Sequence, residues 1–547
     1  MKPPGRVARA LCFLAVTACF AVSSSLAENV VPLYDVHELT FRGPAQKPGD
    51  APARDVELVT TWRHESGQAT QRLCGFWDGD GKGGASGSVF NVRFCPTVTG
   101  QWTLVETTSN QASLKDQHEG YGVTCVDSQH PGFWIADRER TGGRWYRRSD
   151  GSHPYIFGNT MYSFLSECDQ NGPGGSIADD IRGNAQYFKK VRFSIMGCRY
   201  PHPRVKPFLD DAGKPTDDGD FSHRPNPAWF SQRVDLAVRE AYERDLIADL
   251  ILCGPDTEDA RSVLHAGHNA GDPTPLLKYI AARYGSYPNV WICLCNEFDI
   301  KKPKYSTQQI ARFGRTMRRF LPHPTPMSIH AKPRDWYSDL NTTPPWHDLI
   351  IQKKIKTLPV AADWVARNHA IGGNVPVIDD ELAYEGKGDG WSEGDVIEAH
   401  LGAFLGGGYG TTGHKPAGKQ GHYFWGRFKA AEHRAADNLL WLRQQIDDRI
   451  TFWKMAPMGP PASSGTLGIF QNVHADSRAM AWPGREYVLG TNRARQGIKV
   501  RLPKGTWQVR RCDVMTRKGE TLSVRASGAF SFDAPNQRAV LFHFKRQ

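Results

Sequence analysis

The chain has 547 residues, of which 39% are hydrophobic and 23% are charged, and its formal net charge is +11. This length allows two to four domains, and the basic residues are scattered rather than grouped in blocks, which argues against nucleic-acid binding. The scattered positive charge leaves two interpretations open: an ordinary solvated surface, or attraction to an acidic polysaccharide.

The first 27 residues have the pattern of an export signal. A basic region, Lys2 to Arg9, precedes an apolar core from Leu11 to Val22. That core is too short to span a bilayer comfortably, and Ser25-Leu-Ala27 is a small-x-small cleavage site. We therefore predict a signal peptide over 1–27, a secreted or periplasmic protein, and no membrane association after cleavage.

Residues 28–132 alternate apolar and polar side chains over short runs. Val56 to Trp62 and Val89 to Phe94 are two such runs, and Gly, Pro and Asp residues separate them. Alternation with period two, interrupted by frequent turn signals, is typical of the strands of a β-sandwich. The pattern predicts an N-terminal β-sandwich over 28–132.

Strand-like and helix-like segments alternate from residue 133 to 458. Eight candidate strands are Tyr155–Gly158, Arg192–Met196, Ile247–Leu252, Val290–Cys295, Pro326–His330, Asp348–Gln352, Val375–Ile378 and the segment around Leu405 to Tyr409. Such alternation favours an α/β fold, a (β/α)₈ TIM barrel over 133–458. A doubly wound open sheet is the alternative, but no Gly-rich phosphate loop follows the first strand.

Two acidic residues follow predicted strands of this barrel. Val290–Cys295 is almost wholly apolar and leads directly into Asn296-Glu297, and Glu381 comes just after Val375–Ile378. A βα unit takes roughly 30 residues. The 84 residues between the two acids therefore fit three units, which places Glu297 after strand 4 and Glu381 after strand 7. Both would lie at the C-terminal strand ends, where barrels build their active sites.

Two carboxyl groups that face each other are what retaining glycoside hydrolysis requires. One donates a proton to the leaving oxygen, and the other, ionised, attacks the anomeric carbon. Asp379, Asp380 and Glu385 compete with Glu381 for the second role. Alternation puts Asp379 and Glu381 on one side of the strand and Asp380 on the other, and the strand-end rule favours Glu381. For Glu297, the rival interpretation is a solvated acid at a strand end.

The last part of the chain returns to short strands. Ala430 to Met455 is amphipathic and is predicted to be the last barrel helix, and Gly459 to Gly465 has the composition of a linker. Residues 466–547 again alternate over short runs, such as Arg485 to Gly490. We predict a C-terminal β-sandwich over 466–547.

Several of these segments resemble known carbohydrate-active proteins. Tyr284 to Glu297 and Pro376 to Glu385 resemble the strand-4 and strand-7 segments of the glycoside hydrolase clan that carries its acid/base on strand 4 and its nucleophile on strand 7. Further resemblances lie in Gly406–Gly413 with Tyr423–Gly426 (strand 8), Gly75–Gly81 with Pro96–Trp102 (DUF5060) and Leu502–Trp507 (the C-terminal sandwich). Within the clan, the chain is similar to the DUF4038/apiosidase-like barrels that follow a DUF5060 sandwich.

The resemblance implies an exported retaining glycosidase acting on a polysaccharide or oligosaccharide, with Glu297 as acid/base and Glu381 as nucleophile. Asn296 would bind the sugar 2-hydroxyl, and Arg199 would hold the nucleophile ionised by its positive charge. The remaining candidates for binding the substrate are His330, Tyr384, Trp425 and Asn159. No cofactor and no metal are implied, and the expected partner is a carbohydrate.

Other chemistries find less support in the sequence. His265-Ala-Gly-His268 has a spacing that could bind a metal, but no HExxH motif and no clear third ligand accompany it. The sequence contains no Gly-x-Ser-x-Gly elbow of the esterases. The alternative from a different class is a non-catalytic carbohydrate-binding protein on a degenerate TIM barrel.

Overall fold

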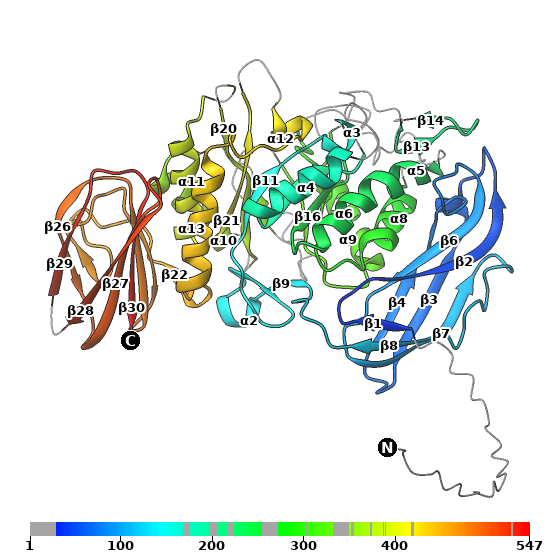
Figure 1. Ribbon diagram of the computed structural model, residues 1–547, viewed down its shortest axis with the longest axis horizontal. Helices are drawn as coiled ribbons and strands as arrows, with labels where there is room; N and C mark the ends of the chain where they lie inside the picture. Colours follow the sequence, from blue (N-terminus) through cyan, green and yellow to red (C-terminus); the bar gives the residue numbers. More distant parts are fainter. Residues whose placement is uncertain are drawn as a thin grey trace, which may run out of the picture.

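The computed structural model describes residues 29–167, 175–196, 205–216, 224–253, 272–300, 304–331, 349–351, 355–371, 375–386, 388, 390–416, 421–526 and 529–547. Its β-sheets fall into three groups along the chain, with a parallel sheet between two groups of mainly antiparallel sheets (Figure 1). The predicted signal, Arg199, His265 and His268 lie outside the described residues.

Two sheets near the N-terminus share one apolar core. The first has the order β1 (Val30–Pro32), β8 (Gly122–Val126), β7 (Gly100–Ser109), β3 (Leu58–His64) and β4 (Thr70–Cys74). The second has the order β2 (His37–Gln46), β6 (Gly87–Phe94) and β5 (Phe76–Trp77). Trp62 of β3 stacks on Phe94 of β6, with ring centroids 4.3 Å apart, within one buried cluster. One face of each sheet therefore enters a common core, as the alternating pattern predicts.

Two sheets near the C-terminus are built in the same way. The larger has the order β22 (Ala456–Pro457), β24 (Arg478–Trp482), β25 (Glu486–Thr491), β30 (Val540–Arg546), β27 (Gly505–Asp513) and β28 (Lys518–Ala526). The smaller has the order β23 (Phe470–Gln471), β26 (Arg495–Arg501) and β29 (Ala529–Ala534). Phe470 and Phe544 meet between the sheets, with ring centroids 5.4 Å apart, inside a second apolar cluster.

The central sheet has eight parallel strands. Their order is β18 (Met327–Ser328), β17 (Val290–Cys293), β16 (Ile247–Ile251), β12 (Lys190–Ser194), β11 (Phe157–Thr160), β21 (Tyr409–His414), β20 (Val377–Glu385) and β19 (Leu349–Ile351). The first strand, β11, pairs with the last, β21, so the sheet curls round until its two ends in sequence meet. A doubly wound sheet has no such pairing, because its strand order reverses instead.

Helices alternate with these strands and cover the outer face of the curled sheet (Figure 1). The longer ones are α4 (Gly175–Tyr187), α6 (Asp235–Tyr242), α8 (Thr274–Tyr284), α9 (Thr307–Phe320), α10 (Leu358–Ile371), α11 (Glu393–Leu405) and α13 (Ala435–Arg449). Ser306 with Gln309, and Ser392 with Asp395, form capping boxes that begin α9 and α11. No helix in the described part of the chain is both long and apolar enough to cross a bilayer.

Shorter elements complete the chain. The helical ones are α1 (Pro52–Asp55), α2 (Arg138–Thr141), α3 (Phe164–Glu167), α5 (Pro227–Trp229), the π-helix η2 (Phe230–Val234), α12 (His422–Trp425) and the 3₁₀ turn η3 (Phe452–Lys454). The remaining strands are β9 (Trp134–Ala136), β10 (Tyr146–Arg148), β13 (Phe208–Leu209), β14 (Pro215–Thr216) and β15 (Arg224–Pro225).

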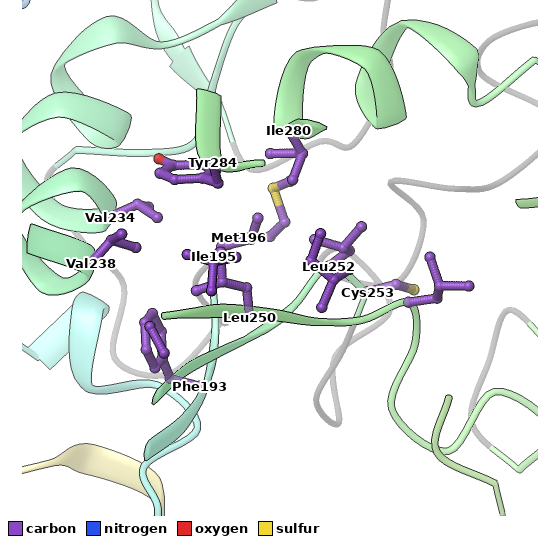
Figure 2. Packing of buried hydrophobic residues seen from close by; sticks show 14 of the residues in the cluster. Phe193, Ile195, Met196, Val234, Val238, Leu250, Leu252, Cys253, Ile280 and Tyr284 are labelled. Atoms are coloured by element: carbon purple, nitrogen blue, oxygen red, sulfur yellow. The ribbon is translucent and has the colours of Figure 1, made fainter. Parts of the chain in front are cut away.

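Side-chain alternation along β12 separates a helix-facing core from a polar interior. Val191 and Phe193 join the cluster that packs against α6 and α8, and Figure 2 shows Phe193 near Val234 and Val238. The intervening Lys190 and Arg192 contact acids of other strands instead. In this strand, apolar side chains that face the helices therefore alternate with polar side chains that face the interior of the curled sheet.

Two predicted elements near the end of the central region have different bounds in the structure. The eighth strand was expected around Leu405 to Tyr409, but Leu405 ends α11 and the strand begins only at Tyr409. Gly406 caps this helix, and Gly407, with a φ of 81°, lets the chain turn into β21. The last helix is shorter than Ala430 to Met455, because it begins at Ala435 and ends at Arg449.

Ion pairs link the N-terminal sheets to the helices α6 and α8, which cover the central sheet. Arg93 of β6 pairs with Asp235 of α6 at 2.6 Å, and Arg283 of α8 pairs with the same Asp235 and with Asp78 at 2.8 Å each. The two arginines lower the pKa of Asp235 far enough to outweigh the opposing effect of its burial. Because removing one partner would leave a buried charge uncompensated, this contact holds the two regions in a fixed arrangement.

Candidate active site

Asn296 and Glu297 form a tight turn directly after β17. The backbone N–H of Asn296 donates to the carbonyl of Cys253 at 2.8 Å, which ties the turn to the end of β16. Glu297 is half-buried and has a φ of 48°, in the left-handed region. This conformation costs a residue with a Cβ roughly 1–2 kcal/mol. Strained backbone of this kind is common at functional sites, so the conformation supports a functional role for Glu297.

Glu381 lies in an irregular part of β20. Strand pairing shifts between Asp379 and Ala383, so that Asp380 to Leu382 lie opposite the single residue Thr411 of β21. Such a bulge re-aims side chains and is common beside active sites. Here it interrupts the simple alternation that the sequence predicted for this segment, and Glu381 is 6% exposed within it.

A path of hydrogen bonds joins the bulge in β20 to the turn that follows β17. Tyr162, which follows β11, donates from its hydroxyl to the Glu381 carboxylate. Arg192 donates from Nη1 to the Tyr162 hydroxyl at 2.9 Å and from Nη2 to Asn296 Oδ1 at 2.7 Å. Through Tyr162 and Arg192, the structure therefore connects Glu381 to the residue that precedes Glu297.

Two aromatic residues predicted for the site lie close to this path. The Tyr384 hydroxyl is 3.2 Å from the Tyr162 hydroxyl. Tyr162 and Tyr384 belong to a small buried cluster with Ile251 and Cys293, and Trp425 packs against it. Burial, followed by the negative charge of Glu381, raises the pKa of both tyrosines well above the usual range. Both phenols therefore keep their protons and can donate hydrogen bonds.

His330 and Asn159 occupy different positions. The backbone N–H of His330 donates to the carbonyl of Cys295 at 3.1 Å, and the carbonyl of His330 accepts from the N–H of Phe298 at 3.0 Å. His330 is therefore bonded to the residues on both sides of the Asn296-Glu297 turn. Burial and then the Arg192 and Lys190 charges lower the pKa of His330 well below its usual value. Asn159 donates to Asn184 of α4 at 2.7 Å. Its predicted contact with substrate stays a prediction.

A charged cluster lies buried beside the path. Lys190 pairs with Asp249 at 2.7 Å and also with Asp380, and Thr411 donates to Asp380 at 2.6 Å. Burial raises the pKa of Asp380, but the Lys190 and Arg192 cations outweigh it, and the net shift is downward. Asp249, for which burial dominates, has a raised pKa. Asp380 is thus surrounded by cations and a hydroxyl inside the sheet.

Sequence reasoning missed Arg192 and Tyr162. It chose Arg199 as the arginine near the nucleophile, but Arg199 lies outside the described residues, whereas Arg192 makes the contacts to Tyr162 and Asn296. A signal was present, because Lys190 and Arg192 place two cations inside an otherwise apolar strand, where charges need partners. Tyr162 follows the first strand and carries no comparable signal.

Comparison with known families identifies two parts of the chain. Residues 30–110 match the family described as a domain of unknown function, DUF5060. Residues 181–416 match the family described as apiosidase-like, catalytic domain. The second match begins in α4 and ends just after β21, so it includes Arg192, Asn296, Glu297 and Glu381. No curated protein matches the chain.

Solved structures share the fold at low sequence identity. A Bacteroides vulgatus protein assigned as a glycoside hydrolase is 21% identical, with a TM-score of 0.73, and the alignment covers 95% of this chain and 100% of that one. A glycoside hydrolase family 5 protein from the same species is 15% identical, with a TM-score of 0.58 and coverage of 76% and 93%. A third structure, described as a glycoside hydrolase, has 15% identity, a TM-score of 0.57 and coverage of 76% and 97%. The family matches confirm the expected resemblance: one part of the chain is similar to DUF5060 and a later part is similar to the apiosidase-like catalytic domain. The solved structures share the fold.

Proposed function

We propose that the protein is a retaining glycoside hydrolase in which Glu297 is the acid/base and Glu381 is the nucleophile. The observation that carries the proposal is the hydrogen-bonded path from Glu381 through Tyr162 and Arg192 to Asn296. It links the bulge of the seventh parallel strand, β20, to the turn that follows the fourth, β17. The match to the apiosidase-like catalytic domain supports the same assignment.

The proposed reaction has two steps. Glu381 attacks the anomeric carbon while Glu297 gives its proton to the departing oxygen, and the bond between that carbon and that oxygen breaks. Water then attacks the same carbon, Glu297 takes a proton from it, and Glu381 leaves as a carboxylate. Two inversions give overall retention of configuration.

Neighbouring residues have supporting roles in this proposal. A hydrogen bond donated to a carboxylate favours its charged form, so Tyr162 keeps Glu381 ready to attack. Arg192 fixes Tyr162 and the amide of Asn296, and that amide would contact the sugar 2-hydroxyl. Trp425, which is only partly buried, offers aromatic surface for stacking on a sugar ring, whereas Tyr384 is 2% exposed and contributes its hydroxyl.

The substrate we propose is a plant or algal polysaccharide or oligosaccharide. The family description suggests terminal apiose as the first sugar to test. The net charge of +11 makes acidic polysaccharides the second group to test. We also propose that residues 1–27 direct export and are then removed, which N-terminal sequencing of the protein from its host would show.

For the architecture, we propose a closed (β/α)₈ barrel over 133–458 between two β-sandwiches, 28–132 and 466–547. The pairing of β11 with β21 and the two antiparallel groups of sheets support it. Limited proteolysis should cut first near Gly459 to Gly465. Early cuts inside 290–380, with the Gly459 to Gly465 segment resistant, would contradict this division.

The test of function compares Glu297→Gln with the parent on two kinds of substrate. Loss of the proton donor should abolish release of sugar from a natural glycoside, which has a poor leaving group. Glycosides with an activated leaving group need no proton, so their glycosylation step should be affected less. Equal activity of both proteins on the natural substrate would reject Glu297. Binding without turnover by the parent would favour the carbohydrate-binding alternative.

A further inference from the structure

Three histidines and one glutamate gather where β21 ends. His414 is the last residue of β21, His422 begins α12, and His433 lies shortly before α13. The rings of His414 and His422 are 4.8 Å apart between centroids, and those of His422 and His433 are 5.3 Å apart. All three imidazoles are buried, with exposures of 9%, 3% and 0%.

Two imidazole nitrogens and one carboxylate oxygen lie close together in this group. His414, His422 and Glu432 each offer one atom, and these atoms lie within 4.8 Å of one another. A tetrahedral zinc ion holds its ligands at about 2.0–2.2 Å, so two ligand atoms on one ion are about 3.3–3.6 Å apart. Glu432 is exposed, and rotation of its side chain can close the remaining gap.

The hydrogen bonds fix which nitrogen of His422 is available. The hydroxyl of Thr412 donates its proton to the carbonyl of Ala383 at 2.7 Å. The same hydroxyl lies 3.2 Å from Nε2 of His433, and because its proton is already used, it must accept a hydrogen bond from this nitrogen. His433 Nε2 must then carry the proton, which leaves Nδ1 of the neutral ring as an acceptor for His422 Nε2 at 3.3 Å. His422 Nδ1 therefore carries a free lone pair.

Within the described residues, that lone pair accepts no hydrogen bond. Nδ1 of His422 and Nδ1 of His414 are both buried without a hydrogen-bond partner there. Leaving such an atom without a partner is unfavourable, because its contact with water has been lost. A histidine that binds a metal through one nitrogen usually donates from the other, and the bond from His422 to His433 is of this type.

The backbone is shaped to bring His422 to His414. Gly421 has a φ of 63°, and a Cβ at this position would lie 2.3 Å from Pro416 Cδ and 2.4 Å from the carbonyl oxygen of His414. Only glycine permits so close an approach. The chain can therefore return over the end of β21 and place the two imidazoles side by side.

We propose that His414, His422 and Glu432 form a binding site for one divalent transition-metal ion of the zinc class. Two neutral imidazoles and one carboxylate suit zinc or cobalt, whereas calcium and magnesium prefer sites made of oxygen ligands. His433 is a positioning residue that orients His422. The site is separate from Glu297 and Glu381, and it stands whether or not these two acids are catalytic.

The ion would fasten α12 to β21. Trp425, the last residue of α12, packs against the cluster that contains Tyr162 and Tyr384. A metal that holds His422 therefore also fixes the position of Trp425 beside the candidate active site. The expected role is structural: it orders one wall of the site and supplies no step of the reaction.

The experiment uses the full chain, stripped with a chelator, dialysed and then loaded with Zn²⁺ or Co²⁺. The parent should retain one equivalent of Zn²⁺ by elemental mass spectrometry, and its Co²⁺ form should show the visible absorption of a tetrahedral ion. Glu432→Gln removes an exposed ligand without disturbing the core, and it should weaken binding at least about tenfold. His422→Gln should weaken it further.

Lys429→Gln is the matched control, because Lys429 pairs with Glu432 at 3.5 Å but offers no ligand. Its metal affinity should equal that of the parent. Hydrogen exchange of the amides of Trp425 and Gly426, which close the α12 turn, should slow when Zn²⁺ binds. Absence of Zn²⁺ and Co²⁺ binding by the parent, or unchanged binding by both Glu432→Gln and His422→Gln, would overturn the proposal.

Discussion

Two adjacent acids of β20 differ in what surrounds them. Asp380 is fully buried and contacts Lys190, Arg192 and the hydroxyl of Thr411. Glu381, the next residue, accepts a hydrogen bond from the neutral phenol of Tyr162. Their carboxyl groups are chemically alike, and the bulge in β20 gives them different partners.

The difference separates a structural acid from a reactive one. An acid paired with fixed cations stabilises the fold, but its charge is already neutralised and is a poor starting point for attack on carbon. A hydrogen bond from a neutral donor, such as the bond from Tyr162 to Glu381, does not cancel the charge of the carboxylate that accepts it. We therefore expect substitutions at Asp380 to act on stability and substitutions at Glu381 to act on turnover.

The largest effect should come from Glu381→Ala. If this carboxylate is the nucleophile, kcat should fall by about 10⁴-fold or more, because no other group forms the covalent intermediate. The melting temperature should stay close to that of the parent. Steady-state kinetics with an activated glycoside and a thermal melt measure both quantities, and a large loss of stability with little loss of activity would reverse the comparison.

Asp380→Ala should show the opposite behaviour. Removal of this acid leaves Lys190 and Arg192 with less compensation in the interior, which costs about 3–5 kcal/mol for a broken buried pair. Urea unfolding followed by circular dichroism measures the change. As a control, Asp179→Ala alters an acid that is 77% exposed and should change the free energy of unfolding little. Equal effects of the two changes would show that the cluster does not stabilise the fold.

The pH dependence of stability should distinguish Asp380 further. Its pKa is lowered in the folded protein, so its charge stabilises the fold above the unfolded pKa of about 3.9, and this contribution is lost as pH falls through the lower folded pKa. The stability difference between the parent and Asp380→Asn should therefore shrink as the pH falls below about 5. An unchanged difference would mean that the pKa of Asp380 is not lowered by folding.

Smaller effects are expected at the two tyrosines. Tyr162→Phe removes a donor to a charged group, which is worth about 1.5–3 kcal/mol, so kcat/KM should fall by about 10- to 150-fold. Tyr384→Phe removes a contact between two neutral hydroxyls, worth about 0.5–1.5 kcal/mol, and should lower kcat/KM less. A larger loss at Tyr384 than at Tyr162 would place Tyr384, rather than Tyr162, next to the reacting groups.

Much of the central sheet could be predicted from the sequence. Each of the eight expected strands overlaps a strand of the structure, because short apolar runs are typical of strands that are buried on both faces. Strand ends were less accurate. The seventh was expected to stop at Ile378, but β20 continues to Glu385, since cations and hydroxyls of other strands allow its acids to be buried.

The candidate site was predicted only in part. Glu297, Asn296 and Glu381 could be proposed because acids and amides after apolar strands stand out in the sequence. Tyr162 could not, since its importance depends on which side chains the curled sheet brings together. The charge of Arg192 within a strand was a usable signal, but its contacts with Tyr162 and Asn296 also depend on that arrangement. His414 and His422 were missed for the same reason, because only the return of the chain at Gly421 makes them neighbours.

Rescue of Glu381→Gly by azide tests the central claim most directly. The substitution should abolish turnover of an activated glycoside, and added azide should restore part of it by occupying the space of the missing carboxylate. NMR should identify the product as a glycosyl azide whose anomeric configuration is inverted relative to the substrate, while the parent enzyme releases a sugar of retained configuration. Inversion by the parent enzyme, or full activity of Glu381→Gly without azide, would contradict the assignment of Glu381 as the nucleophile.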